Sequence, residues 1–105
     1  KMYLRAASHS EQGEYLKAAN AFSRSIELDD RQAGAFLGRA NCFLCLGKAS
    51  SALVDAEMAI QMQTPDWEVE GLRLKSLALF KLGQITEAVS VYNSLLQKLN
   101  NGAIA

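Results

Sequence analysis

Apolar and small residues recur at spacings of three and four along almost the whole chain, which is the period of an α-helix packed on one side. Glycines and short polar segments interrupt this pattern and mark helix ends. The pattern predicts six helices joined by short turns: residues 2–12, 14–28, 31–46, 49–62, a helix from residue 65 to the glycine at 83, and residues 84–99. The expected fold class is therefore all-α.

The six helices are expected to form three pairs in a common register. A glycine, which readily takes the left-handed conformation past a helix end, closes the first helix of each pair at Gly13, Gly47 and Gly83. Fixed spacings from these glycines give three further columns: Ala6, Ala40 and Ser76; Ala18, Ala52 and Ala88; Phe22, Ala56 and Tyr92. Small residues at such positions let two helices approach closely, so each pair is predicted to be a tight antiparallel hairpin.

This register resembles that of the tetratricopeptide repeat (TPR) family, whose unit is a helix-turn-helix of about 34 residues. The resemblance implies one domain over residues 1–105, with units near 1–32, 33–66 and 67–100 and a C-terminal stub at 101–105. It also implies a right-handed superhelix, an α-solenoid. The chain departs from the family where a leucine–glycine pair is usual, since it has Arg5-Ala6, Arg39-Ala40 and Lys75-Ser76, and its proline at residue 65 comes one position late.

The junctions between pairs carry helix-start signals. Asp29 and Asp30 are expected to cap the helix over residues 31–46. Thr64 is expected to cap the next first helix, with Pro65 in its first turn. This junction is two residues longer than the first, and Trp67 is predicted to be buried over it rather than exposed.

The resemblance also implies a concave surface lined by the first helix of each pair. The corresponding residues define the predicted groove: Tyr3, Leu37, Asn41, Leu44, Cys45, Arg73, Leu77 and Phe80. A mostly apolar lining suits an extended apolar segment or an amphipathic helix of a partner. Asn41 is expected to bond a peptide backbone and Arg73 to pair with one carboxylate. Whether a partner or another part of the same protein fills the groove stays open at this point.

Some TPR proteins hold the acidic tails of heat-shock proteins with lysines, asparagines and an arginine. At the corresponding positions this chain has Tyr3, Ala7, Gly38, Arg73 and Leu77, of which only Arg73 suits that role. The sequence therefore argues against binding of heat-shock protein tails.

The helix over residues 84–99 has more apolar surface than one neighbour can cover. Its outer side is expected to meet a further helix or a second copy of the chain, through Val89, Tyr92 and Leu96. The expected function is a scaffold for protein–protein interaction. The alternative is an interior slice of a longer solenoid or a self-association module, in either case without a peptide ligand of its own.

Charge and composition exclude some classes of binding partner and indicate where the protein is located. Eleven basic and 11 acidic residues give a net charge of zero, which argues against binding to nucleic acid or an anionic membrane. No apolar run reaches the ~18 residues of a membrane span, and no signal peptide opens the chain. The expected location is the cytoplasm.

Cys42 and Cys45 have the spacing of a redox or metal motif, but they fall in the second half of a helix, away from the N-terminus that activates a thiol. The single histidine, His9, belongs to another repeat, so four zinc ligands are not available. Both cysteines are expected to act as small apolar residues, Cys42 in the packing and Cys45 at the groove edge. No catalytic constellation is present, so neither an enzyme nor a metal or other cofactor is expected.

Overall fold

The computed structural model describes the backbone of residues 2–104 and the side chains of residues 13–100. The described chain is all-α, as predicted. Its helices, in chain order, are α1 (Met2–Leu28), α2 (Ala33–Cys45), α3 (Ala49–Gln61), α4 (Pro65–Lys81) and α5 (Ile85–Ile104).

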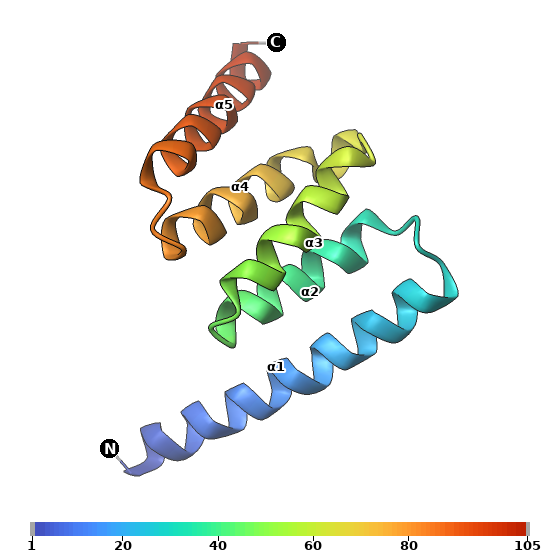
Figure 1. Ribbon diagram of the computed structural model, residues 1–105, viewed down its shortest axis with the longest axis vertical. Helices are drawn as coiled ribbons and strands as arrows, with labels where there is room; N and C mark the ends of the chain where they lie inside the picture. The colour runs from blue at the N-terminus through green and yellow to red at the C-terminus, as the bar shows by residue number, and fades with distance from the viewer. Residues whose placement is uncertain (1, 105) are drawn as a thin grey trace.

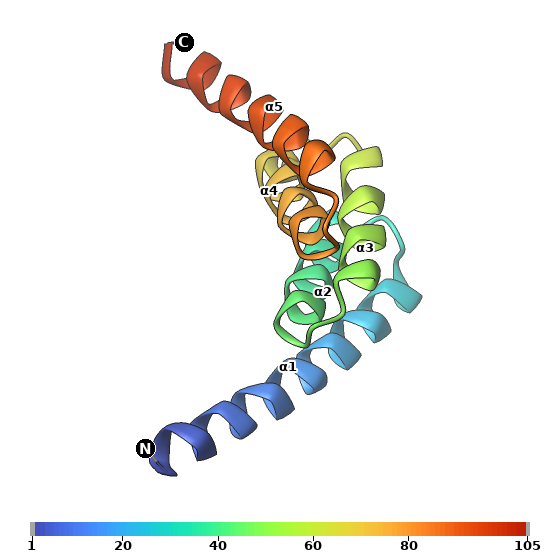
Figure 2. The same cartoon turned by 60° about the vertical axis from the view of Figure 1, so that its left-hand side comes forward.

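The helices stack in the order of the chain. Each packs against the next, and α2 also contacts α4. Figures 1 and 2 show α1 at one end of the stack and α5 at the other, with α2, α3 and α4 between them. Because α1 packs only on α2 and α5 only on α4, both end helices have a side without a neighbour among the described residues.

Two of the three predicted hairpins are present: α2–α3 and α4–α5. Their turns are equivalent, because Gly47 and Gly83 have φ angles of 78° and 82°. In both, the glycine N–H donates to the carbonyl three residues back, and the following N–H donates to the carbonyl five residues back. This is the Schellman arrangement, which satisfies carbonyls left free at a helix end.

The predicted hairpin at the N-terminus is not formed. The expected helices over residues 2–12 and 14–28 are one continuous helix, α1, so the predicted stop at Gly13 is wrong. Gly13 does not have a positive φ, unlike Gly47 and Gly83. A glycine inside a helix weakens it by only about 1 kcal/mol, and a turn needs packing between its two arms to be favoured over a continuous helix.

Two further boundaries differ from the predictions. Helix α2 begins at Ala33 rather than residue 31, and Gln32 occupies its N-cap. Asp29 instead accepts a hydrogen bond from the Arg31 N–H at 3.0 Å, because its short side chain favours a local turn. Helix α5 continues to Ile104, so the predicted C-terminal stub at 101–105 is also wrong. Thr64 and Pro65 begin α4 as predicted.

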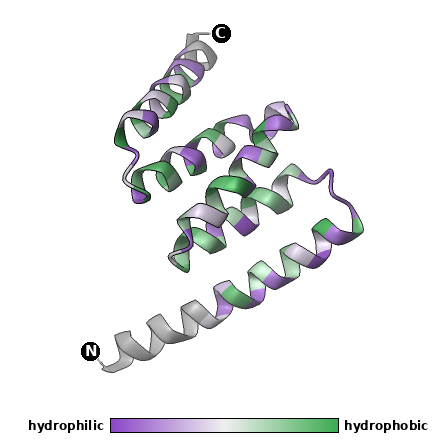
Figure 3. Cartoon of the chain, viewed as in Figure 1, coloured by the Kyte–Doolittle hydropathy of each residue, from purple (hydrophilic) through white to green (hydrophobic). Residues whose placement is uncertain are grey.

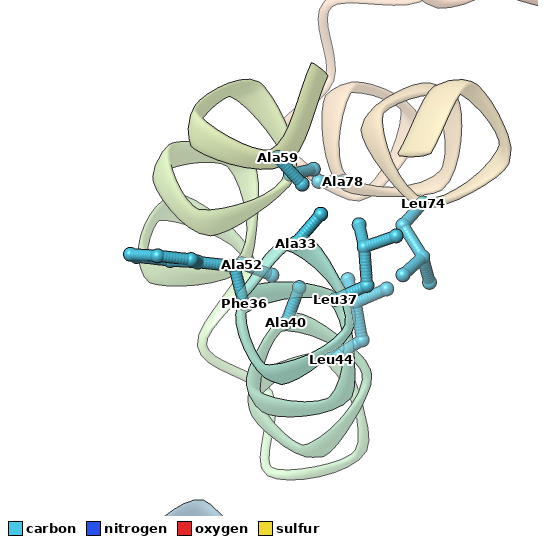
Figure 4. Close-up of a cluster of buried hydrophobic side chains, with 10 residues drawn as sticks. Ala33, Phe36, Leu37, Ala40, Leu44, Ala52, Ala59, Leu74 and Ala78 are labelled. Carbon is cyan, nitrogen blue, oxygen red and sulfur yellow. The ribbon is translucent and has the colours of Figure 1, made fainter. Parts of the chain in front are cut away.

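The core lies where α2, α3 and α4 meet. The small residues of the repeat register are at its centre, since Ala40, Ala52 and Ala56 are fully buried. In Figure 4, Leu37 and Leu44 of α2 point toward Leu74 of α4. Hydrophobic residues are correspondingly dense along α2 and α3 in Figure 3. The second hairpin repeats the contact between columns, because the Ser76 hydroxyl donates to the carbonyl of Ala88 at 3.2 Å.

Candidate functional site

The structure divides the predicted groove between two separate hollows. Leu37, Asn41 and Arg73 line the first, which lies between α2 and α4 and has a volume of about 310 Å³. We call it the α2–α4 hollow; its other lining residues are Gly34, Gly38, Trp67 and Glu70. Residues from two helices that are 32 positions apart in the sequence therefore come together here.

Leu77 and Phe80 line the second hollow, which lies between α4 and α5 and has a volume of about 220 Å³. We call it the α4–α5 hollow; it is completed by Ser76, Ala88, Val89 and Tyr92. Two residues predicted for the groove and two predicted for self-association thus share one surface.

The remaining predicted groove residues lie elsewhere. Leu44 is buried in the core and Cys45 is exposed, but neither lines a hollow. Tyr3 falls outside the side chains that the structure describes. Leu37 is only 2% exposed, so it forms the bottom of its hollow and supports the core at the same time.

Trp67 is the large aromatic residue of the α2–α4 hollow. Its indole packs directly on α2, because a Cβ atom added to Gly34 would lie 2.9 Å from its Cζ2. Its contact is therefore with α2, across from the start of α4. The prediction that it is buried is wrong, however, because 43% of Trp67 remains exposed. Because Gly34 has no side chain, the ring can lie this close to α2, and Trp67 also lines the hollow.

The polar side of the α2–α4 hollow carries both signs of charge. The guanidinium of Arg73 donates from both Nε and Nη2 to Oε1 of Glu70, and the Nε–Oε1 distance is 3.0 Å. Both side chains are more than one-third exposed. Asn41 is exposed on the facing helix. A partner carboxylate at Arg73 would therefore compete with Glu70, a competition that was not predicted from the sequence.

An ion pair that was not predicted from the sequence joins α2 to α3. Arg39 of α2 binds Asp55 of α3 through two hydrogen bonds of 2.7 Å, and Asp55 is only 2% exposed. Arg39 also donates to the Ser23 hydroxyl of α1 at 3.0 Å. The hydrogen bond that Arg39 donates to Asp55 raises the pKa of Arg39 despite the opposing effect of burial. The pair thus connects three helices.

Arg39 is also held by aromatic contacts. Its guanidinium carbon lies 5.6 Å from the centroid of the Phe36 ring and 5.7 Å from that of Phe43. Both distances are in the range of a cation–π interaction. The sequence carried one signal for this pair: Arg39 is a charged residue at a position where small or apolar residues are usual. That Asp55 is its partner follows only from the packing of α2 against α3.

The two cysteines are free and differ in environment. Cys42 is buried, as predicted, and Cys45 is exposed. Burial raises the pKa of the Cys42 thiol, and the proximity of Cys45 adds to the effect. A raised pKa disfavours the reactive thiolate, so Cys42 has the character of a packing residue.

Over the described residues, no three side chains of histidine, cysteine, aspartate or glutamate gather in a way that would hold a metal ion. Within the same part of the chain, no helix has both the length and the apolar character needed to cross a membrane.

Comparison with known proteins gives one recurring similarity. The chain is 32% identical over 80 residues to Outer dynein arm-docking complex subunit 4 of Xenopus laevis, which covers 76% of this chain and 15% of that protein. The human protein of the same name is 32% identical over 81 residues, or 77% of this chain and 12% of its own length. No family model and no solved structure matches. The similarity thus covers most of this chain but only a small part of the relatives, which are much longer docking-complex subunits.

Proposed function

We propose that this chain is a helical-repeat segment of the TPR type that docks a segment of a partner protein. Two hairpins, α2–α3 and α4–α5, correspond to the expected units over residues 33–66 and 67–100. Helix α1 contains the second helix of the first unit, and the units together form the right-handed superhelix of an α-solenoid. Similarity to subunits of a docking complex supports a role in assembly.

The observation that carries this proposal is the α2–α4 hollow. Its volume of about 310 Å³ is at the small end of the range for ligand pockets, so it takes one or two side chains rather than a whole helix. Leu37 and the exposed face of Trp67 provide apolar contact. Asn41 provides an amide for a peptide backbone, and Arg73 with Glu70 provides charged groups at the rim. This combination suits an extended peptide with an apolar anchor.

The relatives indicate where to look for the partner. Their name describes a subunit of the complex that docks outer dynein arms. We therefore infer that the partner is a protein of such an assembly inside the cell, and that this segment acts by binding rather than by catalysis.

Affinity capture with defined variants tests the hollow. The purified chain is immobilised and exposed to extract from cells that build outer dynein arms. Trp67→Ala, or Asn41→Ala combined with Arg73→Glu, is expected to reduce capture of the specific partner at least tenfold. Val54→Ala is the matched control, because Val54 is 59% exposed and lines neither hollow. Unchanged capture by correctly folded hollow variants would show that the groove assignment is wrong.

The alternative is that the segment has no ligand of its own and is an interior slice of a longer solenoid. The observation favouring it is that the chain spans only 12–15% of the relatives' length. In that case the hollow variants would leave binding by the longer protein unchanged, whereas disrupting the core at Leu74 would impair it.

A further inference from the structure

Helix α5 has a regular apolar stripe on the side that α4 does not cover. The stripe follows the 4-3-4-3 spacing of a helix–helix seam, and each member is 40–52% exposed: Ile85, Val89, Tyr92, Leu96 and Leu99. Ala88 and Leu95, by contrast, are buried. Only α4 packs against α5 among the described helices, and Figures 1 and 2 show no other helix beside it.

The stripe is continuous with the α4–α5 hollow, because Val89 and Tyr92 belong to both. Across the hollow, Leu77 is 38% exposed and Phe80 is 62% exposed. We call these seven residues the α4–α5 apolar surface. Side chains of this size and exposure leave on the order of 700 Å² of apolar area in water, which is near the ~800 Å² that each partner contributes to a standard interface. A single patch of this size is larger than monomeric proteins usually show.

We propose that the α4–α5 apolar surface binds the same surface of a second copy of this chain, with two-fold symmetry. The surface has both parts of a self-complementary contact. Phe80 and Tyr92 are 62% and 50% exposed, and the 220 Å³ hollow that they line can receive a ring from the other copy. A two-fold interface uses the same patch on both chains, so a patch with both a projection and a recess fits itself.

Charge permits this pairing. At 100° per residue, Glu87 and Lys98 lie on the opposite side of α5 from the stripe, and Lys98 is engaged with Glu68 of α4 at 2.7 Å. The stripe is flanked on its open side by uncharged Thr86, Asn93 and Asn100. Two identical α5 stripes can therefore meet without bringing like charges of α5 together, whereas self-pairing of a charged stripe would be opposed.

The spacing of the stripe residues also determines how two α5 helices would align in the dimer. Tyr92 is the middle of the stripe, so an antiparallel pairing places it on the two-fold axis, against Tyr92 of the second copy. The same symmetry brings Ile85 opposite Leu99 of the second copy, whereas Val89 and Leu96 of the second copy lie one residue out of exact register. The pairing is distinct from the α2–α4 hollow, so it goes beyond the proposed docking function.

Sedimentation equilibrium of the 105-residue chain tests the proposal. The expected mass at high concentration is twice the 11.4 kDa of one chain. Tyr92→Lys and, separately, Val89→Glu are expected to weaken dimerisation at least tenfold, with helical content preserved in circular dichroism. Val54→Lys is the matched control on α3 and should leave the dimer intact. A monomer at the highest soluble concentration would overturn the proposal, as would a dimer that both stripe variants leave unchanged.

Disulfide cross-linking tests the two-fold register, in a Cys45→Ser background that removes the exposed native thiol. Tyr92→Cys is expected to link to itself under mild oxidation. Ile85→Cys alone should not, but it should link when mixed with Leu99→Cys. Equal cross-linking of Ile85→Cys with itself would contradict the antiparallel pairing. Trp67→Ala should leave cross-linking unchanged, so failure of the docking function and failure of this proposal are distinguishable.

Discussion

At the scale of single residues, the Arg39–Asp55 pair is the principal polar feature of the interior. Asp55 is the buried charged residue among the described side chains, and both of its oxygens accept hydrogen bonds from Arg39. Taking one partner away leaves the other as an uncompensated buried charge, which costs more than the pair itself contributes.

We expect Asp55→Ala to lower the free energy of unfolding by about 1.5–3 kcal/mol, because it removes the charged hydrogen bonds of Arg39, whose side chain is 21% exposed. The double variant Arg39→Met with Asp55→Leu should recover most of that loss. Urea denaturation measures both. The control is Glu57→Ala at the exposed contact with Lys75 of 3.5 Å, where surface pairs contribute roughly 0.2–1 kcal/mol. Equal effects of Asp55→Ala and Glu57→Ala would argue against the buried pair.

The thiols of Cys42 and Cys45 should also differ in how fast they react with a thiol reagent. In the folded chain a thiol reagent is expected to modify Cys45 quickly and Cys42 only at the rate of local opening, because Cys42 is buried. Mass spectrometry of partially labelled protein identifies the modified residue. Preferential labelling of Cys42 would contradict its assigned place in the packing.

The raised pKa of Cys42 has a consequence for alkaline stability. Above the ordinary thiol value of 9.0, the unfolded chain loses this proton before the folded chain does, so unfolding becomes more favourable as pH rises toward the higher folded-state pKa. The urea midpoint is expected to fall in this range, and Cys42→Ala should reduce the fall. A Cys45→Ala variant is the comparison and should keep most of the fall, because burial is a larger cause of the raised Cys42 pKa than Cys45 is.

At the scale of the elements, the same residue type ends some helices and continues another. Gly47 and Gly83 have positive φ angles at helix ends, whereas Gly13 lies within α1. After α3 the left-handed position is taken by Gln63, whose φ is 53°. Identical residues thus differ in role because their helices differ in what they pack against.

Gly13→Ala distinguishes a continuous α1 from a hairpin. A Cβ at Gly13 would meet nothing within 4 Å, so alanine should stabilise the helix by about 0.5–1 kcal/mol. Gly47→Ala is the control, and it should destabilise the chain because an L-residue is disfavoured at a φ of 78°. Thermal unfolding compares the two variants. Destabilisation by Gly13→Ala would indicate a turn at this position.

Gln63→Gly should stabilise the junction after α3 by roughly 0.5–1 kcal/mol, because glycine has no side chain to oppose the left-handed conformation. Val54→Gly, at an exposed position in the middle of α3, should destabilise by about 0.5 kcal/mol. If both substitutions shift the urea midpoint in the same direction, the backbone strain assigned to Gln63 is wrong.

At the scale of the whole molecule, the stack is held by contacts between consecutive helices. Such a chain is expected to open from its ends, where a helix has one neighbour rather than two or three. Helix α1 depends on a close approach to α2, since a Cβ on Gly38 would lie 2.4 Å from the ring of Phe22.

Gly38→Ala is therefore expected to loosen α1 more than the rest of the molecule. Hydrogen exchange should become faster in residues 14–28 while the α3–α4 core stays protected, and overall stability should fall by about 1–3 kcal/mol. Gly34→Ala is the comparison, because its Cβ would meet Trp67 instead. Uniform acceleration along the chain would mean that α1 is not an independent end unit.

The period of the apolar residues determined that the chain is helical, and the columns of small residues determined which helices approach closely. Ala40, Ala52 and Ser76 with Ala88 are found at those contacts because helical spacing is a local property. Local capping signals also placed the start of α4 at Thr64 and Pro65.

Tertiary packing decided what these local rules leave open. Gly13 continues a helix because no second arm packs on it there, and Trp67 stays half-exposed because it lies across Gly34 rather than inside the core. The predicted groove became two hollows, since Leu44 is used by the core while Leu77 and Phe80 face α5. A helical pattern fixes which residues share a face, but only the neighbouring helices determine whether that face is buried, hollowed or left in water.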